Sequence, residues 1–100
     1  MPELILNKKF SADLEKLKTN KALIKKIAKC LAFLEKNPLH PGLSIERITN
    51  DPTAWAARVD KKHRLSFEPS ALQPSGSPEW SLPVRLLRIL THDDLYKNPH

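Results

Sequence analysis

The sequence predicts an α+β fold in which two N-terminal helices pack on one face of a small, mainly antiparallel sheet, in the order β-α-α-β-β-β-β. Three stretches carry this prediction. Residues 21 to about 36 repeat apolar side chains at helical spacing, residues 54–68 alternate apolar and polar side chains, and residues 84–90 form an apolar run of strand length. Because the helical patterns come early and the strand patterns come late, we expect one sheet with both helices on the same side.

The N-terminal part reads as one short strand followed by two helices. Residues 3–7 are an apolar run of strand length. Ser11 is the predicted N-cap of the first helix, because Asp13 and Glu15 then lie in its first turns, where the helix dipole favours acids. The second helix follows a break at residues 19–20, and its apolar stripe comprises Leu23, Ile27, Leu31 and Leu34.

The later part contains the remaining strands and one long loop. Residues 43–48 predict a strand with Glu46 on its polar face and a bulge or twist near Arg47, where the alternation breaks. Residues 69–83 are rich in proline, serine and glycine, which predicts a long, mobile loop. Residues 84–90 are apolar on both faces apart from two arginines, so this strand is expected to lie inside the sheet.

Residues 54–68 predict a β-hairpin whose register can be argued from the pattern. A two-residue turn at residues 61–62 would place the apolar side chains of the two strands on opposite faces. A three-residue connection at residues 60–62 instead gives one consistent apolar face. In that register the facing pairs are Val59 with His63, Ala57 with Leu65, and Trp55 with Phe67.

The same register sets Arg58 directly opposite Arg64 on the other face of the hairpin. Like charges that face each other across a strand pair are unfavourable. Two guanidinium groups in this position indicate an anion that binds between them, and phosphate is the natural candidate.

Composition limits the class of protein. A chain of 100 residues with 40% hydrophobic content is expected to form a single domain over residues 1–100. Neither a signal peptide nor an apolar run near the roughly 20 residues of a membrane span is visible, so we expect no membrane partner and a cytoplasmic location. The single cysteine, Cys30, falls on the apolar stripe and is interpreted as a buried structural thiol. The net charge of +6 favours a polyanionic or acidic partner, although lysines that only aid solubility would give the same count.

Several kinds of chemistry find no support in the sequence. The only glycines are Gly42 and Gly76, so there is no glycine-rich phosphate loop. His92 and Asp93 are adjacent, and no other spacing suggests a metal site. No local signature of a serine hydrolase is present. We therefore expect neither a metal nor a cofactor.

A set of arginine, carboxylate, histidine and tyrosine side chains recurs at predicted strand ends: Arg58, Arg64, Arg88, Glu46, His92 and Tyr96. This set suits metal-free phosphoryl transfer within RNA, in which a base takes the proton of a ribose 2′-OH, arginines stabilise charge on the phosphate and an acid protonates the leaving oxygen. A purely structural interpretation stays open beside it. Glu46 would then form a surface ion pair with Arg58 or Arg64, and Tyr96 would be a core aromatic with its hydroxyl at the rim.

The hairpin also resembles a known family. The pattern Trp55-x-x-Arg58-Val59-x-x-x-His63-Arg64-Leu65-x-Phe67 is similar to the hairpin signature of the RelE/ParE toxin superfamily, nearest the YoeB/Txe-like branch of mRNA interferases. The resemblance implies the toxin of a type II toxin–antitoxin system, a ribosome-dependent endoribonuclease that cleaves mRNA in the A site without a metal. Its implied partners are a cognate antitoxin protein and mRNA on the ribosome, with a homodimer or a toxin–antitoxin hetero-oligomer as the assembly.

Carried over by position, the resemblance assigns Arg64 to the phosphate, His92 to the general acid and Glu46 to the general base. The branch has a tyrosine directly after the histidine, whereas this chain has Asp93 there, so Tyr96 is the candidate for that role. Arg58, Lys61, Lys62 and Arg88 are assigned to RNA or phosphate binding. Two other functions remain open: a ParE-like inhibitor of DNA gyrase, and a non-catalytic binding module with the same fold.

Overall fold

The computed structural model describes residues 2–100 and shows an α+β fold built on one mixed five-stranded sheet. The strand order is β1-β5-β4-β3-β2, with β1 parallel to β5 and the other neighbours antiparallel. The predicted order of elements is confirmed, and a short 3₁₀ helix and a C-terminal helix are added to it. The elements are β1 (Leu4–Leu6), α1 (Lys8–Leu17), α2 (Lys21–Lys36), η1 (Pro41–Leu43), β2 (Glu46–Arg47), β3 (Trp55–Arg58), β4 (His63–Pro69), β5 (Val84–Thr91) and α3 (His92–Lys97).

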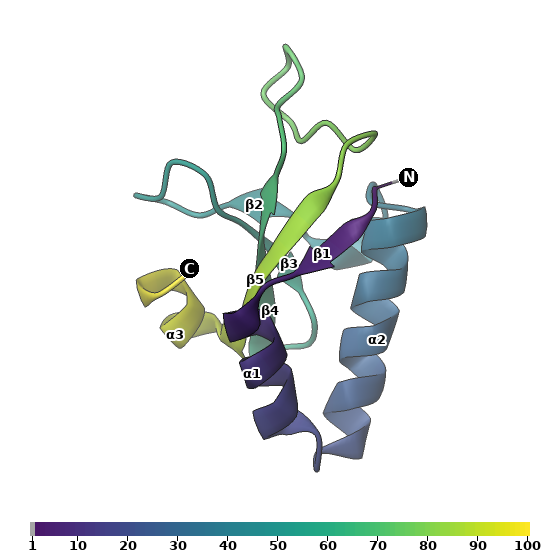
Figure 1. Ribbon diagram of the computed structural model, residues 1–100, viewed down its shortest axis with the longest axis vertical. Helices are drawn as coiled ribbons and strands as arrows, with labels where there is room; N and C mark the ends of the chain where they lie inside the picture. The colour runs from purple at the N-terminus through teal and green to yellow at the C-terminus, as the bar shows by residue number, and fades with distance from the viewer. Residues whose placement is uncertain (1) are drawn as a thin grey trace.

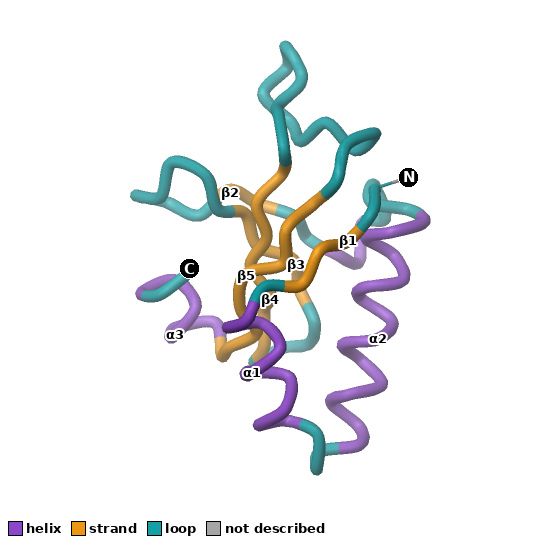
Figure 2. Tube along the Cα trace, in the orientation of Figure 1, coloured by secondary structure: helices purple, strands orange, loops and turns teal. Residues whose placement is uncertain are grey.

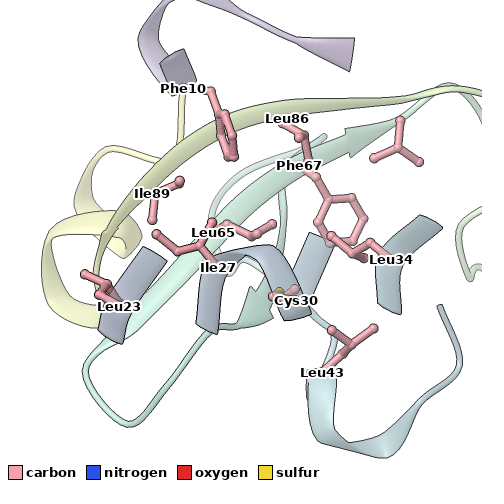
Figure 3. Packing of buried hydrophobic residues seen from close by; sticks show 12 residues of the cluster. Phe10, Leu23, Ile27, Cys30, Leu34, Leu43, Leu65, Phe67, Leu86 and Ile89 are labelled. Carbon is pink, nitrogen blue, oxygen red and sulfur yellow. The ribbon is translucent and has the colours of Figure 1, made fainter. Parts of the chain in front are cut away.

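The main core lies between the sheet and the helices α1 and α2 (Figure 3). The stripe of α2 contributes Leu23, Ile27, Cys30 and Leu34, which are all at most 3% exposed. They pack with Phe10 of α1 and with apolar side chains of β4 and β5. The predicted burial of Cys30 is confirmed, and this burial raises the pKa of its thiol to about 12, which disfavours the reactive thiolate.

The opposite face of the sheet carries a second, smaller core. It lies under α3, which Figure 1 shows well away from α2. Its buried members are Ile48, Ala54, Ala56, Leu87 and Leu95. The residues after β5 form the helix α3, which is anchored by the fully buried Leu95. Helices therefore cover both faces, and the sheet is the middle layer.

The predicted start of the first helix is wrong. The N-cap is Asn7, whose side chain accepts a hydrogen bond of 2.7 Å from the Phe10 backbone N–H, and Ser11 lies inside the helix. Asparagine is as good an N-cap as serine, and the helix that starts there places Phe10 in the core. Asp13 consequently lies in the second turn and faces β5 instead of the helix end.

The strand predicted at residues 43–48 is mostly irregular. Only Glu46–Arg47 pairs with β3, because Pro41–Leu43 forms the 3₁₀ helix and Ser44 adopts a left-handed conformation with φ of 44°. Of the predicted bulge or twist near Arg47, the bulge is not found, because the Glu46–Ala56 and Arg47–Trp55 pairs follow without a register shift. The irregularity lies between β4 and β5, where Ser66 faces Arg88 and Phe67 faces Leu86, so that Leu87 is the extra residue.

The hairpin register and the position of the last strand are confirmed. Trp55 faces Phe67, Ala57 faces Leu65 and Arg58 faces Arg64. β5 lies inside the sheet, between β1 and β4. The segment between β4 and β5 extends beyond the end of the sheet (Figure 2) and contains its own bridge between Leu72 and Pro78. Its mobility stays a prediction.

Among residues 2–100, no helix combines the length and the hydropathy that a membrane span requires.

Candidate active site

Glu46 and Tyr96 meet on the α3 side of the sheet. Glu46 lies on the two-residue edge strand β2 and Tyr96 on α3, and the Tyr96 hydroxyl donates a hydrogen bond to Glu46 Oε1. Glu46 pairs with Ala56, whose side chain belongs to the core under α3, so the strand register directs both side chains to that face. The contact joins residues 50 positions apart in the chain.

His92 lies beside Tyr96, one helical turn earlier. Their rings stack with centroids 4.4 Å apart and an interplanar angle of 24°. The first residue of α3 is held in place because the His92 backbone N–H donates to the carbonyl of Lys62 in the hairpin turn, at 2.7 Å. The His92 side chain is exposed, with Nδ1 3.4 Å from a carboxylate oxygen of Asp93. An exposed imidazole in this position can exchange protons with a bound ligand.

Arg64 supplies the positive charge of the site from β4. Its Nη1 donates to the backbone carbonyls of Asp60 and His63, which fixes the half-buried guanidinium beside the turn. Burial, followed by the hydrogen bond to Glu46 and the charge of that carboxylate, raises the pKa of Tyr96 to about 12, while Arg64 acts in the opposite direction. Tyr96 is therefore a protonated hydrogen-bond donor at neutral pH.

Arg58 faces Arg64 across the hairpin and is exposed. Within residues 2–100, no carboxylate forms an ion pair with either arginine, so the surface pair of the purely structural interpretation is absent and Glu46 instead accepts the Tyr96 hydrogen bond. Both arginines therefore keep a positive charge that can attract an anion. Lys61 and Lys62 follow in the turn and are also exposed.

Arg88 lies apart from these groups. Its Nε and Nη2 donate to the two carboxylate oxygens of Asp13 at 2.7 and 3.0 Å, and Asp13 also accepts the Ile89 backbone N–H at 3.0 Å. The pairing of β5 with β1 ends at Leu86, so β1 offers no acceptor to the Ile89 N–H, and the Asp13 carboxylate takes that place. With its guanidinium engaged in this way, Arg88 holds α1 against the sheet.

Sequence reasoning missed the part that Asp60 plays. One Asp60 oxygen accepts the backbone N–H groups of Lys62 and His63 at 2.9 and 2.7 Å, and it lies 3.2 Å from His63 Nδ1. This Asx-type turn shapes the connection that presents Arg64 on one side and the Lys62 carbonyl on the other. The position of Asp60, directly after the first predicted strand of the hairpin, was the sequence signal that could have predicted this turn.

The structure therefore brings together four of the predicted side chains, Glu46, Arg64, His92 and Tyr96, and Arg58 is the register partner of Arg64. The four combine a carboxylate, an imidazole, a phenol and a guanidinium group, which are the parts that acid–base chemistry at a phosphate requires. No group of three histidine, cysteine or carboxylate side chains that could hold a metal ion occurs within the described residues.

Comparisons with known proteins support the fold. No protein-family model and no curated protein matches the sequence. Solved structures do match: they are small toxins whose fold this chain shares over almost its whole length. YafQ from Escherichia coli superposes with a TM-score of 0.70 at 16% identity, covering 95% of this chain and 98% of YafQ. A YoeB/ParE toxin from Agrobacterium tumefaciens gives 0.67 at 16% identity, covering 90% and 98%. YoeB from Staphylococcus aureus, solved as a dimer, gives 0.64 at 16% identity, covering 91% and 97%. The chain thus has the YafQ- and YoeB-like toxin fold that the hairpin resemblance implied.

Proposed function

We propose that this protein is the toxin of a type II toxin–antitoxin system and that it cleaves mRNA on the ribosome by metal-free attack of the ribose 2′-OH. The observation that carries the proposal is the Glu46–Tyr96–His92 cluster beside Arg64, on a fold shared with the YafQ and YoeB toxins. These side chains come from β2, β4 and α3, so the fold assembles them from distant segments.

The proposed reaction assigns one step to each group. Glu46 takes the proton of the 2′-OH, whose oxygen then forms a bond to the adjacent phosphorus. Arg64, with Arg58 opposite, stabilises the negative charge that develops on the phosphate oxygens. Protonated His92 gives its proton to the 5′ oxygen as the P–O5′ bond breaks, which leaves a 2′,3′-cyclic phosphate and a 5′-hydroxyl. Tyr96 is a positioning residue that orients Glu46 and packs against the His92 ring.

The ribosome is expected to complete the site. Glu46 and His92, the proposed base and acid, are both exposed, so free RNA would bind without a fixed orientation of its 2′-OH. Lys61 and Lys62 extend the positive charge beside the arginines, and the net charge of +6 attracts RNA. Because the proposed substrate is mRNA on the ribosome, the proposed location of the protein is the cytoplasm.

An antitoxin is the proposed protein partner. YafQ has been solved in a toxin–antitoxin complex with DinJ, and the structure of this chain superposes on that YafQ with a TM-score of 0.69. A basic protein favours an acidic partner by charge complementarity. A homodimer, as in the solved YoeB dimer, is the alternative assembly.

The test is to express the chain in bacteria and map mRNA 5′ ends genome-wide. Cleavage in phase with codons that disappears in His92→Ala and Arg64→Ala, and persists in Lys25→Ala on the exposed side of α2, supports the proposal. Growth arrest with DNA damage and intact mRNA would favour a ParE-like gyrase inhibitor instead. Absence of any toxicity would leave a binding module as the function.

A further inference from the structure

A hollow of about 500 Å³ lies between α2, η1 and the turn that joins β3 to β4. Glu46, Tyr96 and His92 do not line it, whereas Arg58 and the turn lysines do, so the hollow adjoins the candidate active site without containing its acid–base groups. Its volume falls in the range of small-molecule sites, about 300–1,000 Å³. Of the groups with a step in the proposed cleavage reaction, only Arg58 lines the hollow.

The hollow is strongly basic. Its cations are Lys26, Lys29, Arg58, Lys61 and Lys62, and its one carboxylate is Asp60. Asp60 is already engaged, because one oxygen accepts two backbone N–H groups of the turn and the other lies 4.0 Å from Lys26 Nζ. The other four cations form no ion pair within residues 2–100, so their charge is available to a ligand.

Apolar and aromatic groups line the rest of the hollow. Phe33 and His40 stack with centroids 4.0 Å apart and an interplanar angle of 17°. The His40 ring is held because Nδ1 accepts the Gly42 backbone N–H at 3.0 Å, which leaves Nε2 as the donor of a neutral imidazole. A side chain at position 42 would crowd this ring, since a Cβ there would lie 3.0 Å from two of its atoms.

We propose that this hollow binds a nucleoside di- or triphosphate, with the base against the Phe33–His40 pair and the phosphates against Lys29, Lys61 and Lys62. The combination of an aromatic, partly apolar lining with several unpaired cations fits a ligand that has both a ring and more than one negative charge. A single inorganic phosphate would leave the rings unused. The inference rests on the lining of the hollow and does not require nuclease activity, although Lys61 and Lys62 also belong to the proposed RNA-binding surface.

Binding in the hollow also has a physical route to the active site. The Lys62 carbonyl accepts the His92 backbone N–H at 2.7 Å, so a ligand held by the Lys61–Lys62 turn contacts the segment that positions α3.

The first experiment is calorimetric titration of the purified chain with ADP, and with pyrophosphate and adenosine as the two halves of that probe. We expect saturable 1:1 binding of ADP, with each half at least about tenfold weaker, and weaker ADP binding at higher salt. Equal binding of pyrophosphate and ADP would overturn the proposal, because the rings would then contribute nothing. Absence of saturable ADP binding would overturn it as well.

A matched pair of variants localises the site. Lys26→Ala/Lys29→Ala and Lys25→Ala/Lys36→Ala remove the same charge from exposed positions of α2, but only the first pair lines the hollow. We expect the first pair to weaken ADP binding by about tenfold or more and the second to change it less than about twofold. Equal losses of ADP affinity in the two double variants would show that general electrostatic attraction explains the binding, and this would refute the site.

An NMR titration distinguishes a free nucleotide from an RNA chain as the ligand of the hollow. Added ADP should shift the amide signals of Gly42 and Lys61. If a short single-stranded RNA without terminal phosphates shifts these signals while ADP does not, the hollow binds a chain and the proposal of a free nucleotide is wrong. Loss of mRNA cleavage in vivo would leave these binding results unchanged.

Discussion

The Tyr96 hydroxyl donates its hydrogen bond to Glu46, and this contact ties the C-terminal helix to the edge strand of the sheet. This hydrogen bond changes the surroundings of both the Glu46 carboxylate and the Tyr96 phenol. The carboxylate gains a donor that orients it, and the phenol is kept protonated well above its usual pKa of about 10. The remaining members of the site, His92 and Arg64, are placed around this pair.

Titration of Tyr96 tests the contact directly. It is the only tyrosine in the chain, so the phenolate absorbance reports it alone, and we expect a pKa of about 12. Glu46→Gln should lower that pKa toward, but not fully to, the ordinary value, because burial remains. Since the folded-state pKa lies above the unfolded one, the stabilisation is present below pH 10 and lost as the pH rises through 12. An unchanged pKa in Glu46→Gln would contradict the contact.

Arg64→Lys tests whether the fork shape of the guanidinium matters as well as its charge. Lysine keeps the charge but has a single nitrogen, so it cannot hold the two turn carbonyls with one nitrogen and present a second nitrogen to a phosphate. We expect mRNA cleavage to fall by about 100-fold, measured by primer extension on ribosome-bound message. Arg85→Lys is the matched control on the same sheet, because Arg85 is exposed and far from Glu46 in the register. Equal activity of the two variants would remove Arg64 from the mechanism.

Asp13→Ala should be strongly destabilising, by about 3 kcal/mol or more in urea unfolding, because it leaves the Arg88 guanidinium and the Ile89 N–H without their acceptor. Glu15→Ala on the exposed side of the same helix should cost less than about 1 kcal/mol. Similar losses for the two would show that Asp13 is not a buried partner.

The same ion pair decides the role of Arg88. In Asp13→Leu/Arg88→Leu both charges are removed, so we expect stability to recover relative to Asp13→Ala. Cleavage by the folded double variant should persist, because Arg88 is engaged with Asp13 and not with the Glu46–Tyr96 pair. Loss of cleavage in a stably folded double variant would return Arg88 to RNA binding, as the sequence analysis assigned it.

Asn7→Ala and Ser11→Ala distinguish the observed helix start from the predicted one. Asn7→Ala removes the side-chain cap on the Phe10 N–H and should cost about 1 kcal/mol of unfolding free energy. Ser11→Ala changes a position inside α1 and should be neutral or slightly stabilising, since alanine has the higher helix propensity. The opposite order in thermal unfolding would move the cap back to Ser11.

Local patterns predicted much of the fold because their causes are local. The register of the hairpin follows from alternation within residues 54–68, where a one-residue slip would reverse every side chain. The stripe of α2 follows from helical spacing in the same way. The start of α1 was missed because two good capping residues, Asn7 and Ser11, lie one turn apart and the choice depends on where Phe10 is buried.

The sequence by itself determined the fold class, the register that sets Arg58 against Arg64, and the identity of the candidate catalytic side chains. Only the tertiary structure decided which of them meet. Glu46 and Tyr96 are 50 positions apart, and Arg88 and Asp13 are 75 apart, so no periodicity within either segment specifies these contacts. They arise from the way the helices dock on the sheet. Burial of Leu95 packs α3 on one face of the sheet and places Tyr96 beside Glu46. Burial of Phe10 packs α1 on the opposite face and places Asp13 beside Arg88.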